Sequence, residues 1–168
     1  MKKGSRGFSL IELLIVVAII LIIAAIAIPN LLRSRIAANQ ASAVGSLRTL
    51  NTAEITYATT YNTGYTSTLG DLGPPSGTGN PVATAAGLID SILSGGSATA
   101  STSIKSGYQF MYTAAATDAS GRVDTYSITA TPVTVGTTGT NYYYTDMSGV
   151  IRQNSTAVAA STDSPLAG

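Results

Sequence analysis

The N-terminal part of the chain contains a long, almost uninterrupted run of apolar residues. Every residue from Leu13 to Ile28 is apolar. As an α-helix, residues 8–28 would be about 31 Å long, which is enough to span the hydrocarbon core of a bilayer. Glu12 is the one carboxylate in this segment. A charge near the bilayer centre costs at least about 2.5 kcal/mol, so we expect this carboxylate to serve a purpose other than lipid contact.

A second helical pattern begins directly after Pro29. Apolar residues recur there at spacings of three, four or seven: Leu32, Ile36, Ala43, Leu47, Leu50, Tyr57 and Tyr61. This periodicity predicts an amphipathic helix over residues 30–61 whose apolar face packs on a sheet. Glu54 falls on the same stripe, and we place it at the edge. Because the pattern resumes at once, Pro29 predicts a kink within one helix of about 80 Å, from Phe8 to Tyr61.

Turn-forming residues dominate the segment that follows the helical patterns. Residues 62–81 are rich in Thr, Ser, Gly and Pro, and we assign residues 62–107 to a loop region. A short helix is expected over residues 83–93, ended by Gly95-Gly96. Its expected inward-facing side chains are Leu88, Ile89 and Ile92.

Alternating apolar and polar residues then predict strands separated by turns. The expected strands are Tyr108–Ala116, Val123–Thr131, Asn141–Thr145 and Val150–Gln153, with turns at residues 118–121 and 146–149. We expect Tyr126 and Ile128 to face the helix and Pro132 to end its strand. Residues 108–154 thus form an antiparallel sheet of three or four strands, and residues 155–168 a mobile C-terminal tail. The predicted fold class is α+β, a long N-terminal helix packed on this sheet.

Composition excludes several kinds of chemistry. The chain has no His, Cys or Trp, so it has no Cys or Ser-His nucleophile, no Cys/His zinc site and no disulfide. We predict neither an enzyme nor a bound cofactor or metal. Four aspartates raise the question of calcium but are scattered, and turn formation explains them better; they are Asp118, Asp124, Asp146 and Asp163. In Tyr142-Tyr143-Tyr144 a strand would place the middle ring opposite the other two.

The N-terminal residues carry a resemblance to a known family. The leader MKKGSRG, the segment FSLIELLIVVAII and Pro29 resemble the start of type IV prepilins and of the pseudopilins of type II secretion. The resemblance implies that a prepilin peptidase removes residues 1–7 by cleaving after Gly7, and that Phe8 is then N-methylated. It also implies a homopolymer in which residues 8–29 form the filament core.

The charged residues of this segment suggest how such subunits would interact. The new amine at Phe8 would add a full charge to the positive end of the helix. Glu12 of a neighbouring subunit could neutralise that amine and thereby set the register between subunits. Pro29 would ease extraction and packing. Many pilins hold their C-terminal region with a disulfide, so what closes that region here stays open.

The distribution of charge bears on location and partners. Lys2, Lys3 and Arg6 precede the apolar run, which places the N-terminus in the cytoplasm and the C-terminal domain outside. The precursor would reside in the inner membrane, and the mature chain in an extracellular pilus or a periplasmic pseudopilus. Without these three cations the formal charge of +1 becomes −2, so nucleic-acid binding is not indicated.

Other interpretations of the apolar run stay open. Ala25-Ile26-Ala27 supplies an A-x-A signal-peptide cleavage site, which would leave a soluble exported binding domain starting near Ile28. A plain membrane anchor and a buried core helix are the remaining alternatives.

Overall fold

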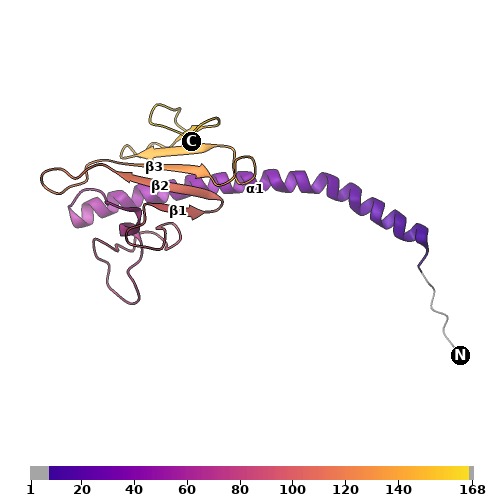
Figure 1. Ribbon diagram of the computed structural model, residues 1–168, viewed down its shortest axis with the longest axis horizontal. Helices are drawn as coiled ribbons and strands as arrows, with labels where there is room; N and C mark the ends of the chain where they lie inside the picture. The colour runs from indigo at the N-terminus through magenta and orange to yellow at the C-terminus, as the bar shows by residue number, and fades with distance from the viewer. Residues whose placement is uncertain (1–7, 167–168) are drawn as a thin grey trace. The chain divides into compact units, whose positions relative to one another are not determined.

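The N-terminal part of the fold is one continuous helix. The computed structural model describes residues 8–166, and its helix α1 (Leu10–Tyr61) contains Pro29 in its interior (Figure 1). Proline removes only one i→i−4 hydrogen bond, and the helical sequence on both sides keeps the remaining bonds. The prediction of a single helix is confirmed, with a start two residues later than expected. The kink at Pro29 stays a prediction.

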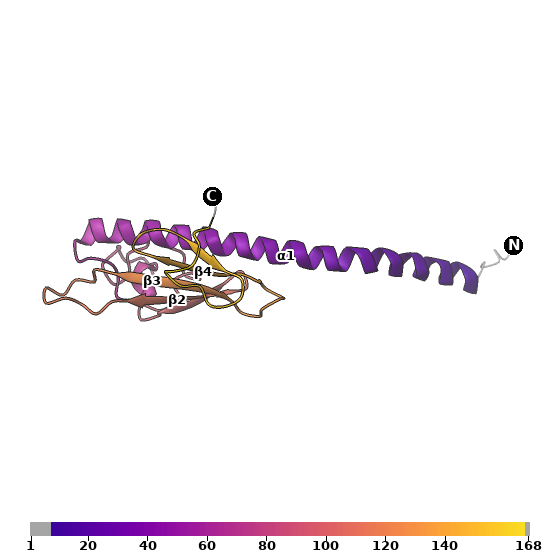
Figure 2. The same ribbon diagram turned by 90° about the horizontal axis from the view of Figure 1, so that it is seen from above.

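The chain divides into two compact units, and the boundary between them lies after Arg35. The described part of the first unit is helical and ends within α1. The second unit begins at Ile36 and contains the rest of α1 together with the sheet. Figure 1 and Figure 2 show residues 36–61 of α1 along one face of this sheet.

The sheet is an antiparallel meander of five strands in chain order. The strands are β1 (Thr102–Lys105), β2 (Tyr108–Ala114), β3 (Tyr126–Pro132), β4 (Tyr142–Asp146) and β5 (Arg152–Asn154). The α+β fold class is thus confirmed, although the expected three or four strands are five. Pro132 is the last residue of β3, as predicted. Proline has no backbone N–H group. At the end of a strand, this costs no hydrogen bond to the next strand of the sheet.

Strand β1 lies in the region that we assigned to loops. Its inward-facing residue is Ser103, so Thr102–Lys105 lacks the apolar alternation by which a strand is recognised. Ser106 and Gly107 join β1 to β2 with φ angles of 50° and 73°. A two-residue connection with both φ angles positive is the preferred hairpin turn. The Ser-Gly pair directly before the alternating strand β2 was the signal for this hairpin.

The hydrophobic core lies between the sheet and residues 43–57 of α1. Tyr126 and Ile128 of β3 belong to the same buried cluster as Leu47 and Leu50 of α1, which confirms their predicted orientation. Alternate residues of β2, β3 and β4 complete this face, namely Tyr108, Phe110, Tyr112, Ala130 and Tyr143. Leu32, at the start of the predicted stripe, is instead exposed. The packed face of α1 therefore begins later than the periodicity suggested.

The short helix expected over residues 83–93 is absent from the described structure. Gly87 has a φ of 67°, which interrupts a right-handed helix. The flanking backbone N–H groups of Ala86 and Leu88 donate to Asp71 and Leu72, far back in the chain. Ile89 and Leu88 face the core as expected, but Ile92 is exposed.

A short helix occurs earlier, as the 3₁₀ helix η1 (Leu69–Leu72). Thr68 and Asp71 form a reciprocal capping box at its start. All four residues of η1 are buried. This element therefore contributes core side chains from the region that we expected to be loop.

Residues 163–166 return to the sheet, although they belong to the segment 155–168 that was expected to be a mobile tail. Leu166 N–H donates to Ile151 O at 2.8 Å, and Gln153 N–H donates to Ser164 O at 3.1 Å. The side chain of Asn154 donates to Asp163 Oδ1 at 3.0 Å. These bonds cover the outer edge of β5. They close the C-terminal region of a chain that has no cysteine.

Candidate functional site

The apolar part of α1 is exposed along its whole length. From Phe8 to Leu32 its large apolar side chains are 47% to 79% exposed. The most apolar 18-residue window has a mean hydropathy of 3.3 and is not buried at all. Within residues 8–166, α1 is the one helix that is long and apolar enough to cross a membrane. So large an apolar surface requires lipid or other protein as its surroundings.

Glu12 has a role within its own helix that the sequence analysis missed. Ser9 precedes the first helical residue, and its backbone N–H donates to Glu12 Oε2 at 2.9 Å. This is the glutamate half of a capping box, in which the third helical residue reaches back to the cap. The pattern Ser-x-x-Glu was its signal. The bond holds the carboxylate at the positive end of the helix, where a negative charge is favourable.

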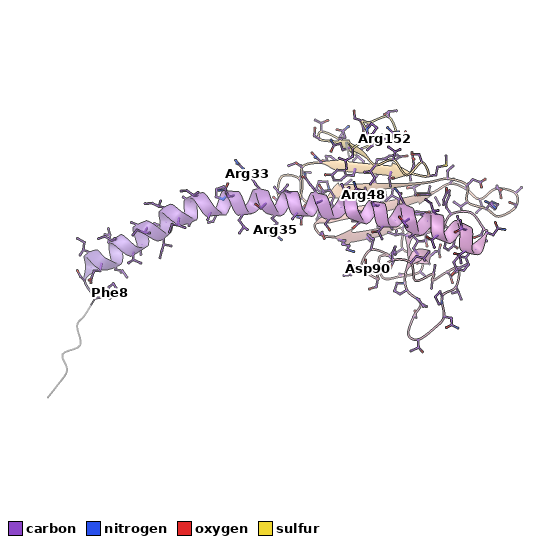
Figure 3. All side chains as sticks on the ribbon, turned by 180° about the vertical axis from the view of Figure 1, so that it is seen from behind. Phe8, Arg33, Arg35, Arg48, Asp90 and Arg152 are labelled. Atoms are coloured by element: carbon purple, nitrogen blue, oxygen red, sulfur yellow. The ribbon has the colours of Figure 1, made fainter. Side chains whose placement is uncertain are left out.

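The other predicted site residues are separate features of this segment. Phe8 lies two residues before the first residue of α1 and is exposed (Figure 3). Pro29 lies in α1 after the apolar run and is also exposed. Gly7 and the rest of the leader lie outside the described residues. Phe8 and Glu12 thus lie together at the start of α1, and Pro29 lies more than four turns farther along.

Glu54 is fully buried, which corrects its expected place at the edge of the stripe. It lies four residues after Leu50 and three before Tyr57, on the core-facing side of α1. Thr66 binds both of its oxygens, with its hydroxyl at 2.6 Å from Oε1 and its backbone N–H at 3.1 Å from Oε2. The Tyr112 hydroxyl donates to Thr66 O at 2.8 Å. The periodicity had already placed Glu54 on this face.

Burial and hydrogen bonding act on Glu54 in opposite directions. Burial raises the pKa of the Glu54 carboxyl above its ordinary value, and the two bonds from Thr66 partly offset that rise by favouring the charged form. The charge of Asp71 raises the pKa of Glu54 further. The Glu54 carboxylate therefore links α1 to Thr66 in the segment that follows the helix. This link is opposed by the free energy needed to remove the carboxylate from water.

Asn51 makes a second polar connection between α1 and the sheet. Its amide donates to Thr145 Oγ1 at 2.8 Å and to Gly149 O at 3.3 Å, and its carbonyl accepts from the Tyr126 hydroxyl at 3.1 Å. All of its side-chain polar atoms are thus used inside the core. The sequence offered no signal for this group, because its partners are 75 to 98 residues away.

Two of the aspartates that raised the question of calcium, Asp118 and Asp146, act in turns. Asp118 accepts from the backbone of Ser120 and Arg122, and Asp146 accepts from the backbone of Ser148. These bonds show the turn-forming role that was predicted for both. In the part of the chain that the structure describes, no group of three or more His, Cys, Asp or Glu could hold a metal ion.

The three consecutive tyrosines alternate across β4 as predicted. Tyr143 is buried, whereas Tyr142 and Tyr144 are partly exposed on the opposite face. Tyr143 packs near Tyr108, with 5.8 Å between ring centroids. Core packing therefore accounts for the middle ring.

Comparison with known proteins places the N-terminal segment in a family. Residues 2–28 match the family model described as "Prokaryotic N-terminal methylation motif". Over 50 residues, 30% of this chain and 23% of the relative, the chain is 54% identical to the "Type IV major pilin protein PilA" of Myxococcus xanthus. Over 37 residues, 22% of this chain and 28% of the relative, it is 62% identical to the "Type IV wide pilus major component PilA4" of Thermus thermophilus.

These matches support a type IV prepilin-like family for the N-terminal segment of the chain. They span only about a quarter of the length of the curated relatives. No solved structure matches the chain significantly.

Proposed function

We propose that this protein is a structural subunit of a type IV pilus. It is cleaved after Gly7, N-methylated at Phe8 and polymerised through the apolar part of α1. The observation that carries the proposal is the long exposed apolar segment, which begins within the matched methylation motif. Both curated relatives are named as pilus components, which favours a pilus over the pseudopilus of a type II secretion system.

The apolar segment would serve in two successive surroundings. Before assembly it lies in the inner membrane, with the cations of the leader in the cytoplasm. In the filament the same side chains pack against the α1 helices of other subunits. In both states they are removed from water, so transfer between them costs little hydrophobic free energy. Pro29 removes one backbone hydrogen bond and loosens the helix locally, which eases extraction and packing.

Glu12 would set the stagger between subunits. The capping bond from Ser9 already holds its carboxylate at the start of α1. A pair formed with the Phe8 amine of a neighbour would be strongly distance-dependent in apolar surroundings. Desolvating both charges offsets much of the attraction, so the contribution of the pair is mainly to register. The prepilin peptidase, the inner membrane and other subunits are the partners in this proposal.

Intact-mass and N-terminal peptide spectra of the protein from its native cells test the proposal. We expect a chain that begins at Phe8 and carries one added methyl group. A chain beginning near Ile28 would show instead that the apolar run is a discarded signal peptide. The alternative of a soluble exported binding domain would then replace the filament subunit.

Substitution of Glu12 tests the proposed role in register. We expect Glu12→Ala to leave cleavage at Gly7 intact and to reduce the filaments recovered from cells by about tenfold or more, because an unpaired amine would be left buried between subunits. Glu12→Gln is the matched control, because its amide oxygen still accepts from Ser9 N–H. If Glu12→Gln assembles normally, the negative charge is not required. Loss in both variants supports the charge pair.

A further inference from the structure

Two arginines follow the apolar segment of α1, and they form no ion pair among the described residues 8–166. Arg33 and Arg35 are exposed, and within residues 8–166 no carboxylate oxygen lies within 4.0 Å of either guanidinium. Figure 3 shows both on the helix beyond the apolar run. The described unit that contains them supplies one acid, Glu12, which lies near the start of α1.

The distance along α1 places these arginines at a defined depth. At 1.5 Å per residue, Arg33 and Arg35 lie about 38 and 40 Å from Phe8. A bilayer is about 30 Å thick across its hydrocarbon core and about 40–45 Å including its headgroups. If Phe8 lies at one boundary, both guanidinium groups reach the headgroup layer of the opposite leaflet. Their spacing of two residues directs them to different sides of the helix.

Arginine suits the phosphate groups of that layer. Its planar guanidinium forms bidentate charge-assisted hydrogen bonds with phosphate oxygens, and its aliphatic stem can lie along apolar surface. Cations on the exported side of a span work against the ordinary distribution of charge around a membrane helix. Their position directly after the apolar segment therefore calls for a compensating interaction.

We propose that Arg33 and Arg35 bind the phosphodiester headgroups of anionic lipids in the leaflet opposite the N-terminus. This contact fixes the depth of α1 in the membrane while the subunit awaits assembly. The inference rests on the proposed function, because it requires the subunit to reside in a bilayer. It adds a lipid-binding site that is separate from the Phe8–Glu12 contact between subunits.

The full chain in vesicles of equal parts phosphatidylcholine and phosphatidylglycerol provides the test. After gentle release into detergent, native mass spectrometry measures the ratio of the two lipids that stay bound. For the variant Arg33→Gln/Arg35→Gln we expect the preference for phosphatidylglycerol to fall about fivefold per arginine, equivalent to about 1 kcal/mol each. Arg33→Lys/Arg35→Lys should retain part of the preference, because the charge remains and the bidentate geometry is lost.

Arg48→Gln is the matched control. Arg48 is also exposed on α1, but it lies 13 residues beyond Arg35, or about 20 Å of helix. An unchanged lipid ratio in the double glutamine variant would overturn the inference, as would an equal loss in Arg48→Gln. If the unaltered chain fails to insert into vesicles, the proposed membrane-resident subunit fails as well. Insertion without any effect of Arg33 and Arg35 removes the lipid site alone.

Discussion

Glu54 is the residue at which sequence pattern and physical chemistry conflict most clearly. It interrupts an apolar stripe, yet α1 turns its side chain fully into the core. A buried carboxylate is costly unless hydrogen bonds replace the lost water. Thr66 supplies two such bonds, one from its backbone and one from its hydroxyl. A buried carboxylate is therefore tolerated at this position, because the fold places Thr66, 12 residues later in the chain, against it.

This arrangement predicts how stability depends on pH. Because the folded-state pKa of Glu54 is raised above its unfolded value near 4.5, folding favours the protonated form. The contribution of Glu54 to stability is therefore greatest below that unfolded value and is lost as pH rises through the folded pKa. Glu54→Gln should remove this loss, so the stability of the variant relative to the unaltered chain should increase as pH rises above the ordinary carboxyl pKa of 4.5.

Urea unfolding of the detergent-solubilised chain at several pH values measures this effect. Glutamine keeps one oxygen that can accept from Thr66 N–H, and its NH2 group can donate to the Thr66 hydroxyl, so both contacts can persist without the charge. Asp118→Asn provides a contrast, because hydrogen bonds from Ser120 and Arg122 lower the pKa of Asp118. Its substitution should not reproduce the Glu54 profile. Parallel stability curves for Glu54→Gln and the unaltered chain would contradict the prediction.

Two glycines in different elements should respond oppositely to alanine. Gly45 lies within α1, where an added Cβ would meet no atom within 4 Å. Gly45→Ala should stabilise the chain by about 0.5–1 kcal/mol, because alanine loses less backbone freedom in a helix. Gly107 has a φ of 73°, and an added Cβ would lie 2.8 Å from the Thr138 Cβ.

Gly107→Ala should therefore destabilise the chain by at least about 1–2 kcal/mol, because it adds left-handed strain and a close contact. Urea unfolding of the two variants and the unaltered chain measures the sign of both changes in the free energy of unfolding. Stabilisation by Gly107→Ala would show that the β1–β2 turn is not held in the described conformation.

The C-terminal closure gives a prediction about local opening. Asn154 joins β5 to Asp163 and also accepts from the backbone N–H groups of Thr156 and Ala157. Asn154→Ala should weaken the returning segment by about 1–3 kcal/mol, since several hydrogen bonds are lost together. Hydrogen exchange at the amide of Leu166 should accelerate accordingly, while the amides of β2 and β3 stay protected.

Asn80→Ala serves as its control, because Asn80 is exposed in a loop outside β5 and its returning segment. Equal exchange at Leu166 in both variants would show that Asn154 does not hold the segment. Faster exchange in Asn154→Ala alone would assign the closure to this side chain rather than to general destabilisation.

Among the described residues, the buried core and the exposed apolar segment are formed by different parts of the chain. The buried cluster begins at Ala43 and contains no residue of the apolar run. A variant that lacks residues 1–28 should therefore keep its folded core, with a change in unfolding free energy of about 0.5 kcal/mol or less. It should also stay monomeric and remain in the soluble fraction.

Near-ultraviolet circular dichroism of the buried tyrosines and sedimentation velocity measure these two properties. Retained dichroism with loss of assembly would assign polymerisation to the apolar segment. Loss of the tyrosine signal would mean that the core depends on the first 28 residues, contrary to the observed packing.

The sequence by itself was sufficient to predict the features that depend on residues close together in the chain. The apolar run and the periodicity after Pro29 predicted α1, because helical spacing is set within one or two turns. Alternation predicted β2 and β3 and the inward orientation of Tyr126 and Ile128. The methylation motif was likewise recognisable from contiguous residues at the N-terminus.

Other features required contacts between distant parts of the chain. Ser103 gives β1 a polar inward residue, so this strand exists through its pairing with β2 rather than through its own pattern. Gly87 replaces an expected helix with a turn whose neighbours bond to η1 and its surroundings. Asn51 and Glu54 obtain their partners from the sheet and from Thr66, and Asp163 brings the last residues back to β5. Burying such polar groups becomes favourable only when the folded chain supplies their hydrogen-bond partners, and a sequence window does not contain those partners.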